Sequence, residues 1–259
     1  MEKKMIEECA ARLYESLASR VSISPLSDVI SPLDIDDAYA IQMENVKRCL
    51  AEGEKISGKK IGLTSKPMQE MLGVGEPDYG HLYESMDLTG KPVPADSLLQ
   101  PKVEGEIAFV LKSEVKGPDA TVADVLAATD YVAAALEIVD SRIRDWKLTL
   151  FDTVSDNASS GSYVLGAKKV PVDEVDLVAE QMTFCKNGEA VNSGSGAAVL
   201  GNPAYCVAWL ANKLWNYGVT LGKGEVVLSG ALSAAVNAAA GDTFKAEFGT
   251  LGAVETKFV

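Results

Sequence analysis

The chain has 259 residues, 47% of them hydrophobic, enough to bury a sizeable core in one large domain or one domain with a small subdomain. Its formal net charge of −13 argues against nucleic acid or an anionic membrane as a partner. No apolar run approaches the roughly 20 residues of a transmembrane helix, and acids at Glu7 and Glu8 interrupt what would be the apolar stretch of a signal peptide. We therefore expect a cytoplasmic protein whose four scattered cysteines are reduced.

The first fifth of the chain predicts two helices. Residues 3–20 carry apolar side chains at helical spacing, and Asp34 or Asp36 is a suitable N-cap for a second helix that Gly53 and Gly58 close. From residue 59 onward the pattern changes to short β-prone runs broken by Gly, Pro and Asp. This change predicts a helical N-terminal part over residues 1–58 and a β-rich domain over residues 59–259.

Two helices interrupt the β-prone runs of the second part. Thr121 opens the first with a capping box in which Asp124 replaces the usual Glu, and residues 203–217 form the second, which we expect in the core. No alternation of strands and helices and no Gly-rich phosphate loop is present, which argues against a Rossmann or P-loop enzyme. The fold class is α+β. The predicted strands cover residues 102–112, 131–142, 162–166, 180–186, 225–229, 243–248 and 253–259.

Acidic residues within apolar strands are the most informative feature of the chain. Glu104 and Glu106 lie in the run 103–111 and point to one face, because successive strand residues alternate. Glu137 has a similar apolar context. Two unpaired buried carboxylates cost several kcal/mol, so a cation or a basic side chain should lie between them. Three carboxylates suit Mg²⁺ or Mn²⁺, although a Glu-x-Glu pair also occurs on solvent-facing edge strands.

Other polar residues are further candidates for the functional site. Lys60 is either a solvated strand start or a catalytic group, and Asp78 lies in a run with the composition of a turn. The charged run 140–147 predicts a solvated strand end, and the polar run 151–161 predicts a loop able to orient an anion or water. His81 is the only histidine and is interpreted as a loop residue, which disfavours a histidine-based triad or an activated Ser or Cys nucleophile.

Several strings together resemble the fumarylacetoacetate hydrolase superfamily. They are KIGLTS (60–65), EPDYG (76–80), PKVEGEIAF (101–109), LEIVDSR (136–142) and DTVSDNA (152–158), and the likeness runs in register along most of the chain. The resemblance implies a mixed, rolled β-sheet with a helical N-terminal part, and Mg²⁺ or Mn²⁺ held by Glu104, Glu106 and Glu137. It also implies a catalytic Lys60 with Asp78 and Ser160 in the pocket. We assign the motif residues Tyr79, Asp156 and Asn157 to substrate binding.

The most similar branch contains the 2-keto-4-pentenoate hydratases and the 2-oxo-3-hexenedioate decarboxylases of aromatic meta-cleavage pathways. The strings 144–153 and 229–232 resemble the hydratases, whereas 233–236 (SAAV) departs from their Gly-Pro-Met. The resemblance implies hydration of 2-hydroxypenta-2,4-dienoate to 4-hydroxy-2-oxopentanoate. The alternatives are the decarboxylase, an acylpyruvate hydrolase and a non-catalytic subunit that supports a partner enzyme. A homo-oligomer is expected, and association with a pathway enzyme is a further possibility.

Overall fold

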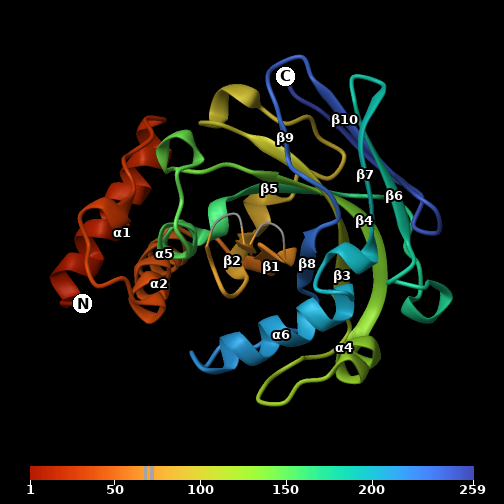
Figure 1. Cartoon of the computed structure of the whole chain (residues 1–259), viewed down its shortest axis with the longest axis horizontal. Coiled ribbons are helices and arrows are strands. Elements are labelled where there is room, and N and C mark those ends of the chain that lie inside the picture. The colour runs from red at the N-terminus through yellow and green to blue at the C-terminus, as the bar shows by residue number, and fades with distance from the viewer. Residues whose placement is uncertain (67–68, 71–72) are drawn as a thin grey trace.

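Two N-terminal helices pack beside the β-rich body of the protein (Figure 1). The computed structural model describes residues 1–66, 69–70 and 73–259. Helix α1 spans Lys3–Ser19 and α2 spans Ile35–Ala51. The Asp34 side chain accepts a hydrogen bond from the Asp36 backbone N–H at 2.9 Å, so Asp34 is the N-cap of α2. None of the described helices is long and apolar enough to cross a membrane.

The main sheet is mixed and seven-stranded. Its order is β2-β1-β8-β3-β4-β5, and the short β9 also pairs with β3. The β1–β8 pair is parallel, while the other pairs are antiparallel, as expected for the predicted mixed sheet. The strands are β1 (Ile56–Gly62), β2 (Asp78–Tyr83), β3 (Lys102–Leu111), β4 (Thr129–Val139), β5 (Ser160–Leu165), β8 (Val226–Ala231) and β9 (Val236–Asn237).

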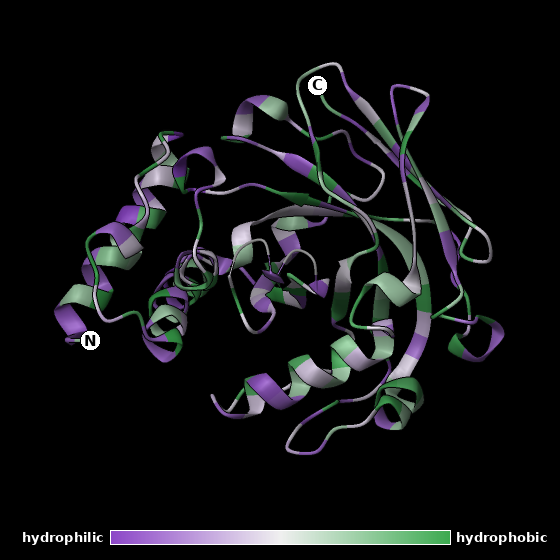
Figure 2. Ribbon diagram, viewed as in Figure 1, coloured by the Kyte–Doolittle hydropathy of each residue, from purple (hydrophilic) through white to green (hydrophobic). Residues whose placement is uncertain are grey.

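A second, four-stranded sheet packs against the long strands β3 and β4. Its order is β11-β10-β6-β7, from β6 (Gln181–Lys186), β7 (Glu189–Ser195), β10 (Thr243–Phe248) and β11 (Ala253–Lys257). The two sheets approach closely at Gly105, where an added Cβ would lie 2.3 Å from the sulfur of Met182. Figure 2 shows how purple and green residues alternate along these strands, typical of sheets with one buried face.

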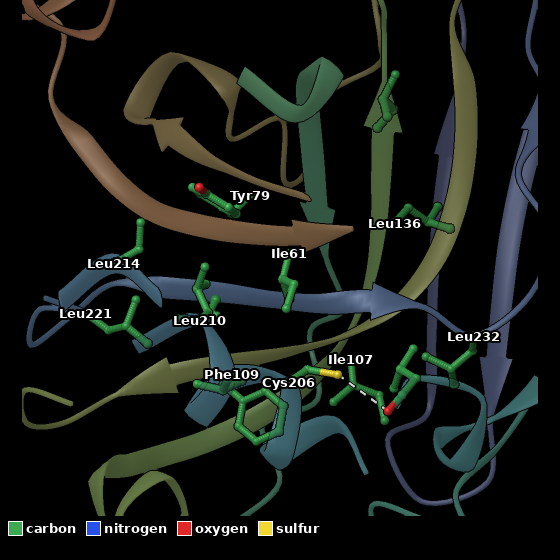
Figure 3. Packing of buried hydrophobic residues seen from close by; sticks show 14 of the residues in the cluster. Ile61, Tyr79, Ile107, Phe109, Leu136, Cys206, Leu210, Leu214, Leu221 and Leu232 are labelled. Atoms are coloured by element: carbon green, nitrogen blue, oxygen red, sulfur yellow. Dashed lines mark hydrogen bonds between the residues drawn. The ribbon is translucent and has the colours of Figure 1, made fainter. Parts of the chain in front are cut away.

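The described residues of the β-rich part include the helices α4 (Val122–Ala128), α5 (Leu150–Ser155) and α6 (Pro203–Trp215). Helix α4 has the predicted capping box between Thr121 and Asp124. Helix α6 buries most of its apolar side chains, and Figure 3 shows Cys206 and Leu210 of this helix near Ile107 and Phe109 of β3. This odd-numbered face of β3 belongs to the main core, which leaves the even-numbered face for the polar groups described below.

Several local predictions were wrong. Residues 78–83 form the buried strand β2, so Asp78 is not in a turn and His81 is not in a loop. The run 140–147 is not wholly solvated, because residues 140–143 are buried. Part of the run 151–161 is the buried helix α5. The division into residues 1–58 and 59–259 stays a prediction, and residue 58 lies within β1.

Candidate active site

Three glutamates meet on one face of the main sheet through strand register. Glu104 of β3 lies directly opposite Glu137 of β4. Glu106 lies two residues further along β3 and therefore on the same face. One carboxylate oxygen from each residue lies within 4.8 Å of the others. We call Glu104, Glu106 and Glu137 the carboxylate triad.

The carboxylate oxygens of the triad form few hydrogen bonds with the described residues. Glu106 accepts a hydrogen bond from the backbone N–H of Gly230 at 2.9 Å, but its other oxygen and both oxygens of Glu137 are buried and form no hydrogen bond with the described residues. Burial, and then repulsion from Glu137, raise the pKa of Glu104 to about 7 and that of Glu106 well above its ordinary value. Carboxylate oxygens grouped in this way fit a hard divalent cation, because such an ion would supply the missing charge and coordination.

Lys60 of β1 supplies one positive charge to this group. Its Nζ lies 3.4 Å from an oxygen of Glu137 and donates a hydrogen bond to the backbone carbonyl of Ala158 at 3.0 Å. Burial by itself lowers the pKa of Lys60, but attraction to Glu137, Asp78 and the other triad members outweighs it, so the pKa lies above its ordinary value. The carboxylates around Lys60 therefore favour its ammonium form.

Asp78 reaches the site because its neighbour on β1 is a glycine. Asp78 lies opposite Gly62, and a Cβ on Gly62 would be 2.4 Å from Asp78 Oδ1 and 3.0 Å from Lys60 Nζ. Asp78 Oδ2 accepts a hydrogen bond from the Thr153 hydroxyl at 2.6 Å. Asp78 Oδ1 is buried and accepts no hydrogen bond from the described residues. One carboxylate oxygen is thus held while the other remains available.

A left-handed turn positions the carbonyl that Lys60 contacts. Asn157, Ala158 and Ser159 have φ values of 53°, 50° and 53°, and each left-handed non-glycine residue costs roughly 1–2 kcal/mol. The Asn157 amide bridges the backbone N–H and carbonyl of His81, and Arg142 forms a buried ion pair with Asp156 at the start of the turn. These contacts offset the strain and fix the Ala158 carbonyl beside Lys60.

The predicted site residues divide into two groups. Lys60, Asp78 and Glu104 line one cleft, and the carboxylates of Glu106 and Glu137 lie beside that of Glu104. Tyr79 points to the opposite side of β2, where its ring packs against Tyr39 and its hydroxyl contacts that of Tyr217. Asp156 and Asn157 support the left-handed turn. The Ser160 hydroxyl donates to the Asn157 carbonyl, and Ser160 lines a separate cavity beside α1 and α2.

The cleft has two lobes that share residues near Glu104. The first, which we call the Lys60 lobe, has a volume of about 190 Å³. Apart from Lys60 and Asp78, its wall includes Val139, Trp146, Leu148, Thr149, Thr153, Ala158 and Ser159. The second, the Ser233 lobe, is lined by Thr64, Ser65, Ala198 and residues 231–234. Gly62, Leu63, Lys102, Glu104 and Ala235 line both lobes.

Sequence reasoning missed Gly62, Lys102 and Trp146 as site residues. A signal for Lys102 was available, because it precedes Glu104 by two residues and so shares its face of the strand. The roles of Gly62 and Trp146 depend on contacts between distant segments and had no such local signal.

Comparison with known proteins identifies the family. Residues 55–259 match the fumarylacetoacetate (FAA) hydrolase C-terminal family. The chain belongs to the fumarylacetoacetate hydrolase family. Like the structures of this family that it resembles, it carries a mixed, curled sheet with helices.

Relatives within the family include hydratases and a decarboxylase. The chain is 46% identical to the 2-hydroxyhexa-2,4-dienoate hydratase of Comamonas testosteroni, over 99% of this chain and 98% of the relative. It is 47% identical to a 2-keto-4-pentenoate hydratase of Burkholderia vietnamiensis, over 98% of this chain and 97% of that relative. It also superposes on the 4-oxalocrotonate decarboxylase of Pseudomonas putida G7, complexed with magnesium and adipate, with a TM-score of 0.96, 35% identity and coverage of 100% and 99%.

Proposed function

We propose that this family member is a metal-dependent hydratase of aromatic catabolism. It adds water to 2-hydroxypenta-2,4-dienoate and forms 4-hydroxy-2-oxopentanoate. The observation that carries the proposal is a cleft lined by Lys60, Asp78 and Glu104, the last of which belongs to the carboxylate triad. Identities of 46–47% to hydratases along nearly the whole chain, against 35% to the decarboxylase, support the same reaction.

The carboxylate triad would hold Mg²⁺ or Mn²⁺. The buried oxygens of Glu106 and Glu137 that form no hydrogen bond within the described part of the chain fit such an ion. The magnesium complex of the related decarboxylase agrees with a divalent cation. When bound, the ion acts as a Lewis acid that stabilises negative charge on the 2-oxygen of the substrate.

The residues around the triad supply proton transfer. The enol proton leaves the 2-oxygen and a proton reaches C5, which gives a 2-oxo-3-enoate; water oxygen then bonds to C4 and a proton goes to C3. Lys60 is placed to transfer a proton, because its Nζ lies 3.4 Å from an oxygen of Glu137 in the triad. Asp78 is suited to accept a proton from water through its free Oδ1, while Thr153 fixes Oδ2. Ser160 would act by supporting the Asn157 carbonyl, and so the turn.

Positive charge in the cleft favours a substrate with one carboxylate. Among the described residues, Lys60 and Lys102 are the basic side chains that line the two lobes. Lys60 already pairs with Glu137. One ammonium group therefore remains for a substrate carboxylate, which fits a monocarboxylate such as the dienoate better than a dicarboxylate.

The second candidate is the decarboxylase. The adipate in the related decarboxylase is a dicarboxylate, and the two proteins share nearly the same backbone. In that reaction the same site would stabilise the enolate left by loss of CO₂. A non-catalytic subunit fits less well, because Lys60, Asp78 and the complete triad are all present.

The wider organisation follows from this proposal. We propose that residues 59–259 carry the chemistry, because every residue assigned a chemical role lies there, and that residues 1–58 form a helical support. We further propose a cytoplasmic homo-oligomer that acts alone or with another enzyme of the pathway.

Loss of the dienol ultraviolet absorbance tests the function. Chelator-treated protein receives freshly generated 2-hydroxypenta-2,4-dienoate with and without Mg²⁺ or Mn²⁺, and Glu106→Ala serves as the inactive control. Metal-dependent formation of 4-hydroxy-2-oxopentanoate would support the hydratase. Full activity of Glu106→Ala would refute the mechanism, and CO₂ release from 2-oxo-3-hexenedioate without dienoate turnover would support the decarboxylase.

A further inference from the structure

Lys102 is a basic residue of the cleft that takes part in none of the proton transfers described above. It lies at the start of β3, two residues before Glu104, so the two side chains leave the same face of the strand. Lys102 is partly buried and lines both lobes of the cleft. It therefore stands where the two lobes meet, beside the carboxylate triad.

The Lys102 ammonium lacks a hydrogen-bonding partner within the described parts of the chain. Its Nζ lies 4.3 Å from the centre of the Trp146 ring, a cation–π contact that leaves the N–H groups free to donate. The other two lysines buried nearby are paired: Lys59 bonds both oxygens of Glu225, and Lys60 contacts Glu137. Lys102 thus differs from both in having donors to offer to a ligand.

Trp146 is held firmly where it contacts Lys102. Its indole N–H donates to the backbone carbonyl of Gln100 at 3.1 Å. Asp145 and Trp146 have φ values of 57° and 55°, so the chain adopts a left-handed conformation to place the ring. The Lys102 ammonium lies over the face of this ring, and it forms no ion pair with Glu104. The negative charge of Glu104 stays available to a cation, and the positive charge of Lys102 to an anion.

We propose that Lys102, held by Trp146, binds the C1 carboxylate of the substrate. This inference rests on the proposed function. The C1 carboxylate is bonded to C2, the carbon that carries the 2-oxygen. The proposed function places the 2-oxygen at the triad, and Lys102 lies next to the triad along β3. The rest of the substrate would extend into the Lys60 lobe, where Val139 and Leu148 offer apolar walls. Lys102 thus selects 2-oxo and 2-hydroxy acids over uncharged ketones.

Calorimetric titration of the metal-loaded full-length protein tests this role. The probe is 2-oxopentanoate, a saturated 2-oxo acid that cannot undergo the hydration. Lys102→Met is expected to weaken its binding by about tenfold or more, because a charge-assisted contact is lost. Lys102→Arg, which keeps the charge, is expected to stay within about threefold of the wild type. The affinity for Mg²⁺ alone should not fall in either variant.

Lys112→Met is the matched control. Lys112 is exposed just beyond the opposite end of β3, so its removal changes the net charge equally without touching the cleft. We expect this variant to bind 2-oxopentanoate as the wild type does. Unchanged binding by Lys102→Met would overturn the inference and leave the proposed function intact. If Lys102→Met weakened the binding of 2-oxoadipate but not that of 2-oxopentanoate, Lys102 would bind a distal carboxylate instead. That result would also overturn the inference. Absence of 2-oxopentanoate binding by the metal-loaded wild type would count against the proposed function itself.

Discussion

Replacing Gly62 with alanine should lower the activity of the site without removing any charged side chain. The added methyl group would lie 2.4 Å from Asp78 Oδ1 and 3.0 Å from Lys60 Nζ, whereas ordinary contact begins at 3.4 Å. The carboxylate must therefore move by about 1 Å, and a displacement of this size in an enzyme site can lower the rate about 100-fold. Thr153 holds the other oxygen of Asp78, so rotation cannot relieve the contact freely.

Two measurements separate this effect from damage to the fold or the metal site. We expect Gly62→Ala to lower kcat about 100-fold while Mg²⁺ affinity stays within about threefold, because the triad lies on β3 and β4. Gly249→Ala is the control, since its nearest neighbour would lie at 3.8 Å. A Gly62→Ala enzyme that folds, binds Mg²⁺ and retains the wild-type kcat would refute the role of this close approach.

Three further predictions concern stability and metal binding. In the wild type, Mg²⁺ at about 100 times its Kd should raise the free energy of unfolding by about 2.7 kcal/mol. In thermal unfolding experiments, the same Mg²⁺ concentration should stabilise Glu106→Gln only slightly. Equal stabilisation of both proteins would rule out the triad as the metal site. Burial, and then Lys59, lower the pKa of His81 to about 3 from 6.5, so its contribution to stability is present above pH 6.5 and is lost as the pH falls towards 3. From pH 7.5 to pH 5 the wild type should therefore lose about 2 kcal/mol more than His81→Asn in urea unfolding, and parallel pH profiles would contradict this. Arg142→Met should cost about 3–5 kcal/mol, because it leaves Asp156 as a buried unpaired charge; a loss below about 1 kcal/mol would show that the ion pair does not hold the turn.

Local sequence patterns were enough to predict the elements that form within one stretch of chain. The caps at Asp34 and Thr121 and the long apolar strand around Glu104 depend on neighbours a few residues away. The alternation of strand residues likewise placed Glu104 and Glu106 on one face before any partner strand was known. The sequence therefore determined that two carboxylates would need a cation or a basic side chain.

Tertiary structure alone decided what completes the site. Glu137 meets Glu104 through the register of β3 and β4, and Asp78 reaches Lys60 because residues 78–83 pair as a strand. The composition of residues 77–80 favoured a turn, but sheet pairing and burial outweighed that local preference. Likewise, packing around His81 and Arg142 sustains a left-handed turn that no local propensity favours. These contacts join residues far apart in sequence, so their energies appear only when the chain is folded.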